Sequence, residues 1–197
     1  MAKASAPLMS FGASGKLAGA LVYFPWKGIQ AVREYVIPAN PKTGAQKAQR
    51  AKMTAAVAEW HGADYNTIDR SAWRVYAGTL VKIMAGFNAM VKTHIDEAIK
   101  TNTWTRIRNC VISAVTATSF VVSIGKVSSG SAPVIHYGTS KLYMPSTITM
   151  TDQTGGIWRG TVTPLLANTG YFFYIDVGTS GTNYGRTGIY YQRTAAA

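Results

Sequence analysis

A change of apolar periodicity near Thr103 constrains the fold of this 197-residue chain more than any other feature. Between residues 44 and 102, apolar side chains recur at the three- and four-residue spacing of amphipathic helices. After Asn102, apolar and polar residues alternate and turn signals recur about every ten residues, which is the pattern of a small β-sandwich. The sequence therefore predicts an α+β protein with two domains.

The second half is expected to form seven strands, the number typical of an immunoglobulin-like or fibronectin type III-like sandwich. Each expected strand lies between two turn signals and alternates apolar with polar residues. The expected strands span residues 109–115, 119–126, 134–138, 147–151, 157–162, 170–177 and 188–193.

The first half is expected to begin with short paired strands, of which residues 28–37 alternate most clearly. The Pro-Ala-Asn-Pro segment that follows fixes φ at both prolines and removes two amide donors, so the strand must end there. Thr43 and Gln46 then have the spacing of a capping box, in which each side chain satisfies a backbone N–H at the start of a helix. A helix should therefore begin at about Gly44.

Three helices are expected between this corner and the period change. The first runs to about His61, with an apolar stripe that includes Met53, Val57 or Ala56, and Trp60. Thr67 is expected to cap the second helix, where Asp69 would lie in the positively polarised first turn. The third is expected over residues 84–100.

Residues 1–22 are expected to form a flexible arm, because Ala, Gly and Ser dominate them and large side chains are few. Such an arm can order on binding, with its spaced apolar residues as anchors against a partner. Residues 23–105 would then be a basic, mostly helical domain, and residues 106–197 a sandwich that folds separately. The expected assembly residues are Leu8, Phe11, Leu17, Tyr23, Phe24 and Trp26.

Residues 38–43 with Gln46 and Arg50 form a Pro-x-Asn-Pro-x-Thr-x-x-Gln-x-x-x-Arg signature. It is accompanied by Gly15, Lys16, Gly28, Arg33, Trp60, residues 69–77 and residues 86–88. In these features, residues 12–92 resemble small structural proteins of tailed bacteriophages and prophages. The resemblance implies a place in the virion, with other virion proteins and further copies of the chain as partners, and it implies no chemistry.

A second resemblance is carried by residues 115–122, 136–140, 165–174 and 189–194. In these segments, residues 107–194 are similar to fibronectin type III-like modules. The resemblance implies that the Tyr171 hydroxyl makes the corner hydrogen bond known in such sandwiches, with its ring covering the end of the core.

The chain has 20 basic and 8 acidic residues, a net charge of +12, and the excess is spread over both halves. This distribution favours a generally basic surface that faces an acidic partner over a dedicated nucleic-acid arm. The candidate contacts to such a partner are Lys42, Lys47, Arg50 and Lys52. No aromatic residues are interleaved with them, so a solvated helix face is favoured over a nucleic-acid site.

No catalytic, cofactor or metal site is expected. His61, His94 and His136 fall in different expected elements, so a three-histidine metal site would require a coincidence across both domains. Cys110 is the only cysteine and lies in an apolar run, where it is expected to be a small buried hydrophobe. Carboxylate pairs with the geometry of general acid–base catalysis, and nucleotide-binding or hydrolase motifs, are absent from the sequence. We therefore expect no enzyme activity and no small-molecule substrate.

The distribution of apolar residues along the chain bears on where the protein is made. No apolar run reaches the length of a membrane span, and the N-terminal residues are too broken by Ser, Gly and Pro to form a signal-peptide core. We expect a protein that has no membrane partner, is made in the host cytoplasm and is incorporated into the virion.

Three functions from different classes fit these features. The first is a structural virion protein that displays the sandwich on the particle. Within this function, a head decoration or minor capsid protein is favoured over a neck or tail component. The second is a DNA-binding packaging or scaffold protein. The third is a host-surface or carbohydrate-binding module that uses Tyr174, Tyr184, Tyr190 and Tyr191, of which the last two should face opposite ways in a strand.

The capping box at the first helix can be tested by a single substitution. Thr43→Ala should lower stability by about 1 kcal/mol, because it removes the side-chain acceptor at the helix start. Thermal unfolding measures the effect, and an unchanged melting temperature would contradict the capping assignment.

Overall fold

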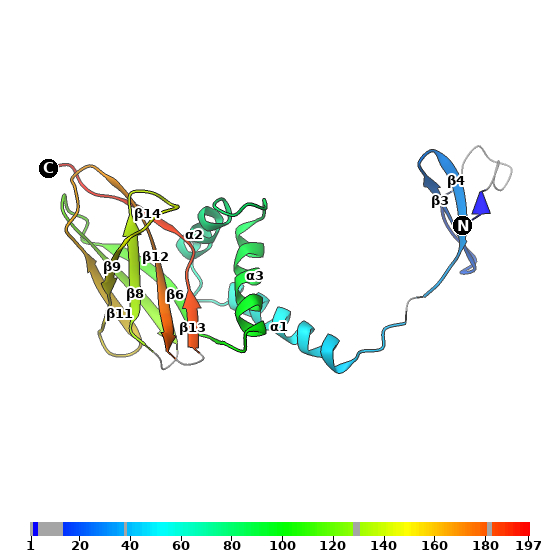
Figure 1. The fold of residues 1–197 in the computed structure, drawn as a ribbon, viewed down its shortest axis with the longest axis horizontal. Helices are drawn as coiled ribbons and strands as arrows, with labels where there is room; N and C mark the ends of the chain where they lie inside the picture. The colour runs from blue at the N-terminus through cyan, green and yellow to red at the C-terminus, as the bar shows by residue number, and fades with distance from the viewer. Residues whose placement is uncertain (1, 4–13, 38, 128–130, 181–182) are drawn as a thin grey trace. The chain divides into compact units, whose positions relative to one another are not determined.

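A computed structural model describes residues 2–3, 14–37, 39–127, 131–180 and 183–197 (Figure 1). The chain divides into two compact units, Met1–Thr43 and Gly44–Ala197. The division therefore falls before the first helix and not near residue 105, where the sequence placed it. Helices and sandwich belong to one unit because the second helix packs against the sandwich, as the contacts below show.

The first unit is a four-stranded antiparallel sheet in the order β1-β4-β3-β2. Strands β3 and β4 form a hairpin whose two turn residues, Lys27 and Gly28, have φ angles of 48° and 79°. Two positive φ angles are the requirement of a type I′ turn, which matches the right-handed twist of the strands. The bounds are Ala2–Lys3 for β1, Gly15–Leu17 for β2, Leu21–Trp26 for β3 and Ile29–Glu34 for β4.

This sheet corrects the expectation of a flexible arm for the part of residues 1–22 that the structure describes. Leu17 pairs with Leu21 in the ladder between β2 and β3, so this segment is strand and turn. Leu8 and Phe11 lie outside the described residues. The expected strand at residues 28–37 is confirmed as β4, although it ends three residues earlier, at Glu34.

The second unit begins with three helices, α1 (Gly44–Trp60), α2 (Thr67–Ala77) and α3 (Gly86–Ile99). The expected start at Gly44 is confirmed. The cap of α2 is Asn66 and not Thr67: the Asn66 side chain accepts from the Asp69 amide, and the Asp69 carboxylate accepts from the Asn66 amide. The helices enclose a small core of their own around Trp73 and Met90, both fully buried.

The rest of the second unit is a β-sandwich of two sheets. One has the order β10-β11-β7-β6, and the other runs β5-β13-β12-β8-β9, with β14 also paired to β12. Apart from the short β5, this is the strand arrangement of an immunoglobulin-like sandwich, the architecture that fibronectin type III modules share. The described residues contain ten strands here in place of the expected seven, because β5 and β10 have two residues each and the last strand is divided into β13 and β14.

The strand bounds follow the expected positions closely. They are Thr103–Trp104 (β5), Arg106–Ser113 (β6), Phe120–Val127 (β7), Pro133–Gly138 (β8), Ser146–Thr149 (β9), Thr151–Asp152 (β10), Ile157–Val162 (β11), Gly170–Ser180 (β12), Asn183–Arg186 (β13) and Tyr190–Arg193 (β14).

The sandwich core is filled by alternate residues of both sheets, among them the fully buried Phe120 and Phe173, whose ring centroids lie 5.5 Å apart. Tyr171 is buried at the end of this core, and its hydroxyl accepts a hydrogen bond of 3.0 Å from the Leu166 amide. The expected tyrosine corner is therefore confirmed.

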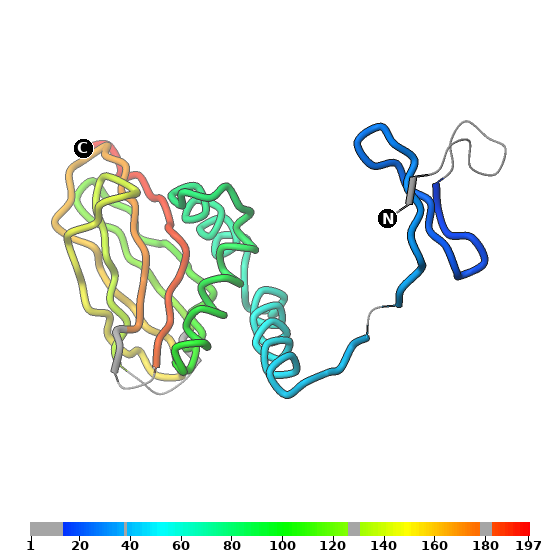
Figure 2. Tube along the Cα trace, turned by 45° about the vertical axis from the view of Figure 1, so that its right-hand side comes forward, coloured from blue at the N-terminus to red at the C-terminus, as the bar shows by residue number. Residues whose placement is uncertain are grey.

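Helix α2 packs where the last strand is interrupted, between β13 and β14 (Figure 2). The Thr187 hydroxyl accepts a 2.9 Å hydrogen bond from the Ile175 amide, and the Ile189 amide donates to the Ala72 carbonyl of α2 at 3.0 Å. Ala72 is also part of the sandwich core. Helix α2 is thus hydrogen-bonded to the segment between β13 and β14 and also contributes to the sandwich core. These contacts bring α2 close to the backbone of Gly188.

Gly188 allows this close approach, which gives a second prediction. A Cβ added at Gly188 would lie 2.3 Å from backbone atoms of Ala72 and Trp73, and neither can yield without moving the helix. Gly188→Ala should therefore lower the free energy of unfolding by about 2 kcal/mol or more. Denaturant unfolding monitored by tryptophan fluorescence measures it.

The matched control is Gly44→Ala, where an added Cβ meets nothing within 4 Å. Alanine favours the helix over glycine, so this variant should be as stable as the parent or slightly more so. Equal unfolding midpoints for the two variants would show that α2 does not pack against residue 188.

Candidate functional site

Three carboxylates connect the helical segment to strand β6. Glu59 at the end of α1 lies 2.9 Å from the Arg106 guanidinium, and Asp64 lies 3.1 Å from that of Arg108. Burial raises the pKa of Glu59, and the positive charge of Arg106 opposes the rise. The third carboxylate, Asp69, is the most deeply buried of the three, with a relative exposure of 1%.

The Asp69 carboxylate accepts four hydrogen bonds that come from three separate parts of the chain. The donors are the amides of Asn66 (3.2 Å), Asn109 (2.8 Å) and Cys110 (3.3 Å), and the hydroxyl of Tyr190 (2.8 Å). These groups belong to the helix cap, to β6 and to β14. The carboxylate thus joins α2 to an edge strand of each sheet.

Local backbone geometry presents the two β6 amides to this carboxylate. Asn109 has a φ angle of 56°, and the pairing of β6 with β7 shifts its register between Arg108 and Val111. Such a bulge withdraws amides from the strand ladder. The Asp69 oxygens accept hydrogen bonds from two amides at this bulge, so neither is left unsatisfied.

The electrostatics of this cluster are those of a structural junction. Burial raises the pKa of Asp69, while the Tyr190 hydroxyl and the three amides favour the ionised form and oppose the rise. Burial also holds the pKa of Tyr190 well above its usual value, so its hydroxyl remains a donor at neutral pH. With its oxygens occupied by protein donors, this carboxylate is not arranged to take a proton from a substrate.

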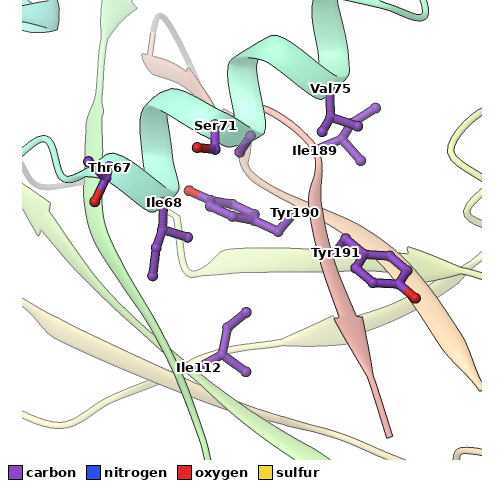
Figure 3. Close-up of a pocket in the computed structure, with 9 residues that line it drawn as sticks. Thr67, Ile68, Ser71, Val75, Ile112, Ile189, Tyr190 and Tyr191 are labelled. Carbon is purple, nitrogen blue, oxygen red and sulfur yellow. The ribbon is translucent and has the colours of Figure 1, made fainter. Parts of the chain in front are cut away.

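A shallow apolar groove of about 280 Å³ lies beside this junction, between α2, β6 and β14 (Figure 3). Ile68 and Val75 of α2, Ile112 of β6 and Tyr191 of β14 line it. Figure 3 shows the Tyr190 ring beneath the helix, with Tyr191 on the opposite side of the strand. The expectation that these two tyrosines face opposite ways is confirmed: Tyr190 is in the core, and Tyr191 is exposed.

The expected assembly residues of the first unit lie on both faces of its sheet. Tyr23 and Leu17 share one face, and Phe24 and Trp26 share the other, because residues paired across the strands point to the same side. Tyr23 and Phe24 are half-buried, and Leu17 and Trp26 are exposed. The sheet thus has apolar residues on both faces.

The candidate basic residues are exposed or half-buried. Lys47, Arg50 and Lys52 lie on α1, and Lys42 lies in the segment before it, which belongs to the first unit. The apolar stripe of α1 is buried only in its second half: Ala56 is fully buried, whereas Met53 is exposed. Residues 44–51 are exposed on every side of the helix.

The histidines occupy three separate places in the second unit. His61 is exposed, His94 is buried with its ring centroid 4.9 Å from that of Trp104, and His136 lies 3.3 Å from Asp176. Burial lowers the pKa of His94. Across the described ranges, no group of three metal-ligating side chains forms a site.

Two further sequence expectations can be compared with the structure. Cys110 is fully buried, as expected, and burial raises the pKa of its thiol. Of the helices in the described part of the chain, none combines the length and the apolar character needed to cross a membrane.

Sequence reasoning missed a stack of rings on the outer face of the sheet that contains β12. The His136 ring stacks on Tyr174 at a centroid distance of 4.6 Å, and the Arg186 guanidinium lies 4.4 Å from the Tyr174 ring and 4.6 Å from the Tyr76 ring. These residues come from β8, β12, β13 and α2, so no local sequence pattern predicts that they lie close together.

No protein-family model matches the chain, and no curated protein matches it. Solved structures with some similarity include a redesigned β-sandwich protein, with 20% identity and a TM-score of 0.37 over 46% of this chain and 90% of that one. They also include the FN1–FN3 domains of chicken CNTN1, with 15% identity and a TM-score of 0.38 over 48% of this chain and 31% of that one. The sensor domain of the anti-sigma factor RsgI4 from Pseudobacteroides cellulosolvens has 20% identity and a TM-score of 0.32 over 47% of this chain and 96% of that one. Scores of this size support no conclusion about function.

The Asp69 junction gives a third prediction. Asp69→Ala should lower the free energy of unfolding by about 3 kcal/mol, because it leaves buried donors on three segments without an acceptor. Urea unfolding followed by circular dichroism measures the change.

Asp96→Ala is the matched control, since Asp96 is a residue of α3 whose side chain is 44% exposed and pairs with Lys92 one turn away. Surface pairs of this kind contribute little, so the control should stay within about 0.5 kcal/mol of the parent. If the Asp69 variant also stayed within that range, the carboxylate would not join the helix to the two strands.

Proposed function

We propose that the protein is a non-enzymatic structural component of a tailed-phage virion, which assembles through its first unit and displays the β-sandwich on the particle. A head decoration or minor capsid role comes first, and a neck or tail role second. The partners would be further copies of the chain and other virion proteins. The observation that carries the assembly part is the exposure of the first unit's apolar side chains.

In the first unit, Ala31 is the only buried residue among those described from 14 to 43. Six large apolar side chains have relative exposures between 36% and 76%: Leu17, Leu21, Trp26, Ile29, Val36 and Ile37. A chain of about 40 residues needs more burial than this to hold a fold by itself. An isolated sheet likewise needs a packed face. A partner that covers these residues would supply it.

The aromatic residues of the first unit, of which Trp26 is exposed, suit an interface. Trp and Tyr are enriched among the residues that dominate interface energies, with losses of about 2 kcal/mol or more on truncation. Trp26 lies at the end of β3, directly before the hairpin turn, with more than half of its surface exposed. We therefore assign it the central role in assembly.

The second unit suits display because its core is complete. Both sheets of the sandwich contribute fully buried residues, and α2 closes the side where β6 and β14 run. A unit of this kind keeps its shape on a particle surface without help from neighbours.

A second candidate, binding to nucleic acid or another acidic partner, is favoured by one feature of α1. The exposed first half of this helix carries Lys47 and Arg50 and no carboxylate, and its single acidic residue, Glu59, is buried against Arg106. A positively charged surface of this kind attracts polyanions in a salt-dependent way.

The fourth prediction tests assembly through Trp26. Sedimentation of the full chain should show an oligomer, and Trp26→Ser should shift it towards the monomer by about 2 kcal/mol per interface. Removing residues 1–43 should leave a folded monomer of the second unit, because residues 44–197 form a compact unit of their own.

Leu166→Ser is the control, since Leu166 is an exposed apolar residue of the second unit and should not affect the mass. Equal masses for the full chain, the Trp26 variant and the truncated chain would contradict assembly through the first unit. The virion part is tested separately by mass spectrometry of purified phage particles, where absence of the protein would refute it. A monomer that binds DNA with a steep salt dependence would favour the second candidate.

A further inference from the structure

Arg186 is an unusual cation on the outer face of the sandwich. Its guanidinium lies against two tyrosine rings, those of Tyr76 and Tyr174, and its Nε atom is buried without a hydrogen-bond partner. Within the described ranges, no carboxylate lies at ion-pair distance from it. The nearest candidate along the ladder is Asp176, its cross-strand neighbour, which pairs with His136 at 3.3 Å.

The two rings hold the guanidinium in place. Arginine stacks well on aromatic faces because its guanidinium is planar and weakly hydrated. Stacking covers the faces of the guanidinium and leaves its N–H donors pointing outward in the guanidinium plane. In this orientation they can bind a carboxylate or phosphate, which arginine holds with two parallel hydrogen bonds. A positioned arginine without an anion is therefore a candidate binding group.

Arg186 lines a pocket of about 270 Å³ between the end of α2, β12, β13 and the loop after β8. The residues that line it are Tyr76, Thr79, Lys141, Leu142, Tyr143, Met144, Tyr174, Arg186 and Ile189. Two of them are cations and none is acidic. The pocket is therefore positively charged, and Asp176 and His136 lie outside its lining.

The rest of the pocket is suited to a polar ring. Three tyrosines supply hydroxyl groups that can donate or accept hydrogen bonds. The Thr79 hydroxyl donates to the Tyr76 carbonyl at 2.7 Å and can accept a further hydrogen bond. Leu142 and Tyr143 lie at the rim with exposures of 75% and 70%, so an apolar chain and an aromatic ring are open to solvent beside the cations. The volume is just below the usual range for ligand sites, which fits a single sugar residue better than an extended ligand.

We propose that this pocket binds an acidic sugar, with the carboxylate or phosphate group held by Arg186 and Lys141 and the sugar ring packed against Tyr143. The two anionic groups make the same contacts with a guanidinium, so the pocket chemistry defines an anionic monosaccharide unit. This binding site is independent of the assembly through the first unit, because all its residues belong to the second unit.

The binding experiment uses the full chain and four probes at equal ionic strength. Glucuronate carries the carboxylate, glucose 6-phosphate the phosphate, glucose the ring alone and acetate the anion alone. Ligand-observed NMR titrations should give dissociation constants for at least one acidic sugar that are about tenfold or more below those for glucose and for acetate, since a charge-assisted hydrogen bond contributes about this factor. Comparing the two acidic sugars shows which anion is preferred.

Two substitutions locate the site. Arg186→Gln should weaken binding of the preferred acidic sugar by about tenfold or more, and Lys141→Gln should weaken it by a smaller factor. Lys141 is exposed, so its variant tests the pocket even if the Arg186 variant unfolds. Arg159→Gln is the control: it removes one exposed positive charge from the opposite sheet and should leave the affinity unchanged.

Three results would overturn the proposal. Glucose that binds as tightly as the acidic sugars would remove the role of the anion, and acetate that binds as tightly would remove the role of the ring. Unchanged affinity in the Lys141 variant and in a folded Arg186 variant would place binding elsewhere. Absence of binding by both acidic sugars at millimolar concentration would refute the site itself, whatever the oligomeric state of the protein.

Discussion

The second unit depends on the hydrogen bonds of one buried carboxylate. Asp69 is the point where the cap of α2, the bulge of β6 and the side chain of Tyr190 meet. A buried carboxyl group costs free energy unless its oxygens accept hydrogen bonds, so the donors around Asp69 have to be in place together in the folded unit. The helix, the bulge and the interrupted last strand are therefore one arrangement. The close packing of Gly188 against α2 belongs to the same arrangement.

Local patterns were sufficient to predict most of the strands and all three helices. Alternation placed β7, β8, β11 and β12 within a few residues, because a half-buried strand imposes its period on the sequence directly. The tyrosine corner was also predicted, from a resemblance that rests on a short segment around Tyr171. Strands β5 and β10 were missed because two residues cannot show a period.

The features that the sequence did not reveal are long-range contacts. Asp69 and Tyr190 are 121 positions apart, and the sequence around neither residue predicts a contact with the other. The predicted domain boundary near residue 105 was placed where the apolar periodicity changes from helical to alternating. Helices and strands can nevertheless pack together in one compact unit, as they do here. Helix α2 contributes Ala72 to the sandwich core, and helices and sandwich lie in one compact unit. The stack of rings around Arg186 combines residues of four elements and likewise could not be predicted from the sequence.

The placement of α2 also bears on how sandwiches behave when many are held close together. Free strand edges invite pairing with other chains, and natural sheets avoid this with short, charged or covered edges. Here β10 has two residues and β9 has four at the far edges of the two sheets, while α2 covers β6 where its bulge removes amides from the ladder. Two sandwiches that approach one another at these edges therefore offer few free strand amides and carbonyls for pairing, which disfavours fusion of their sheets.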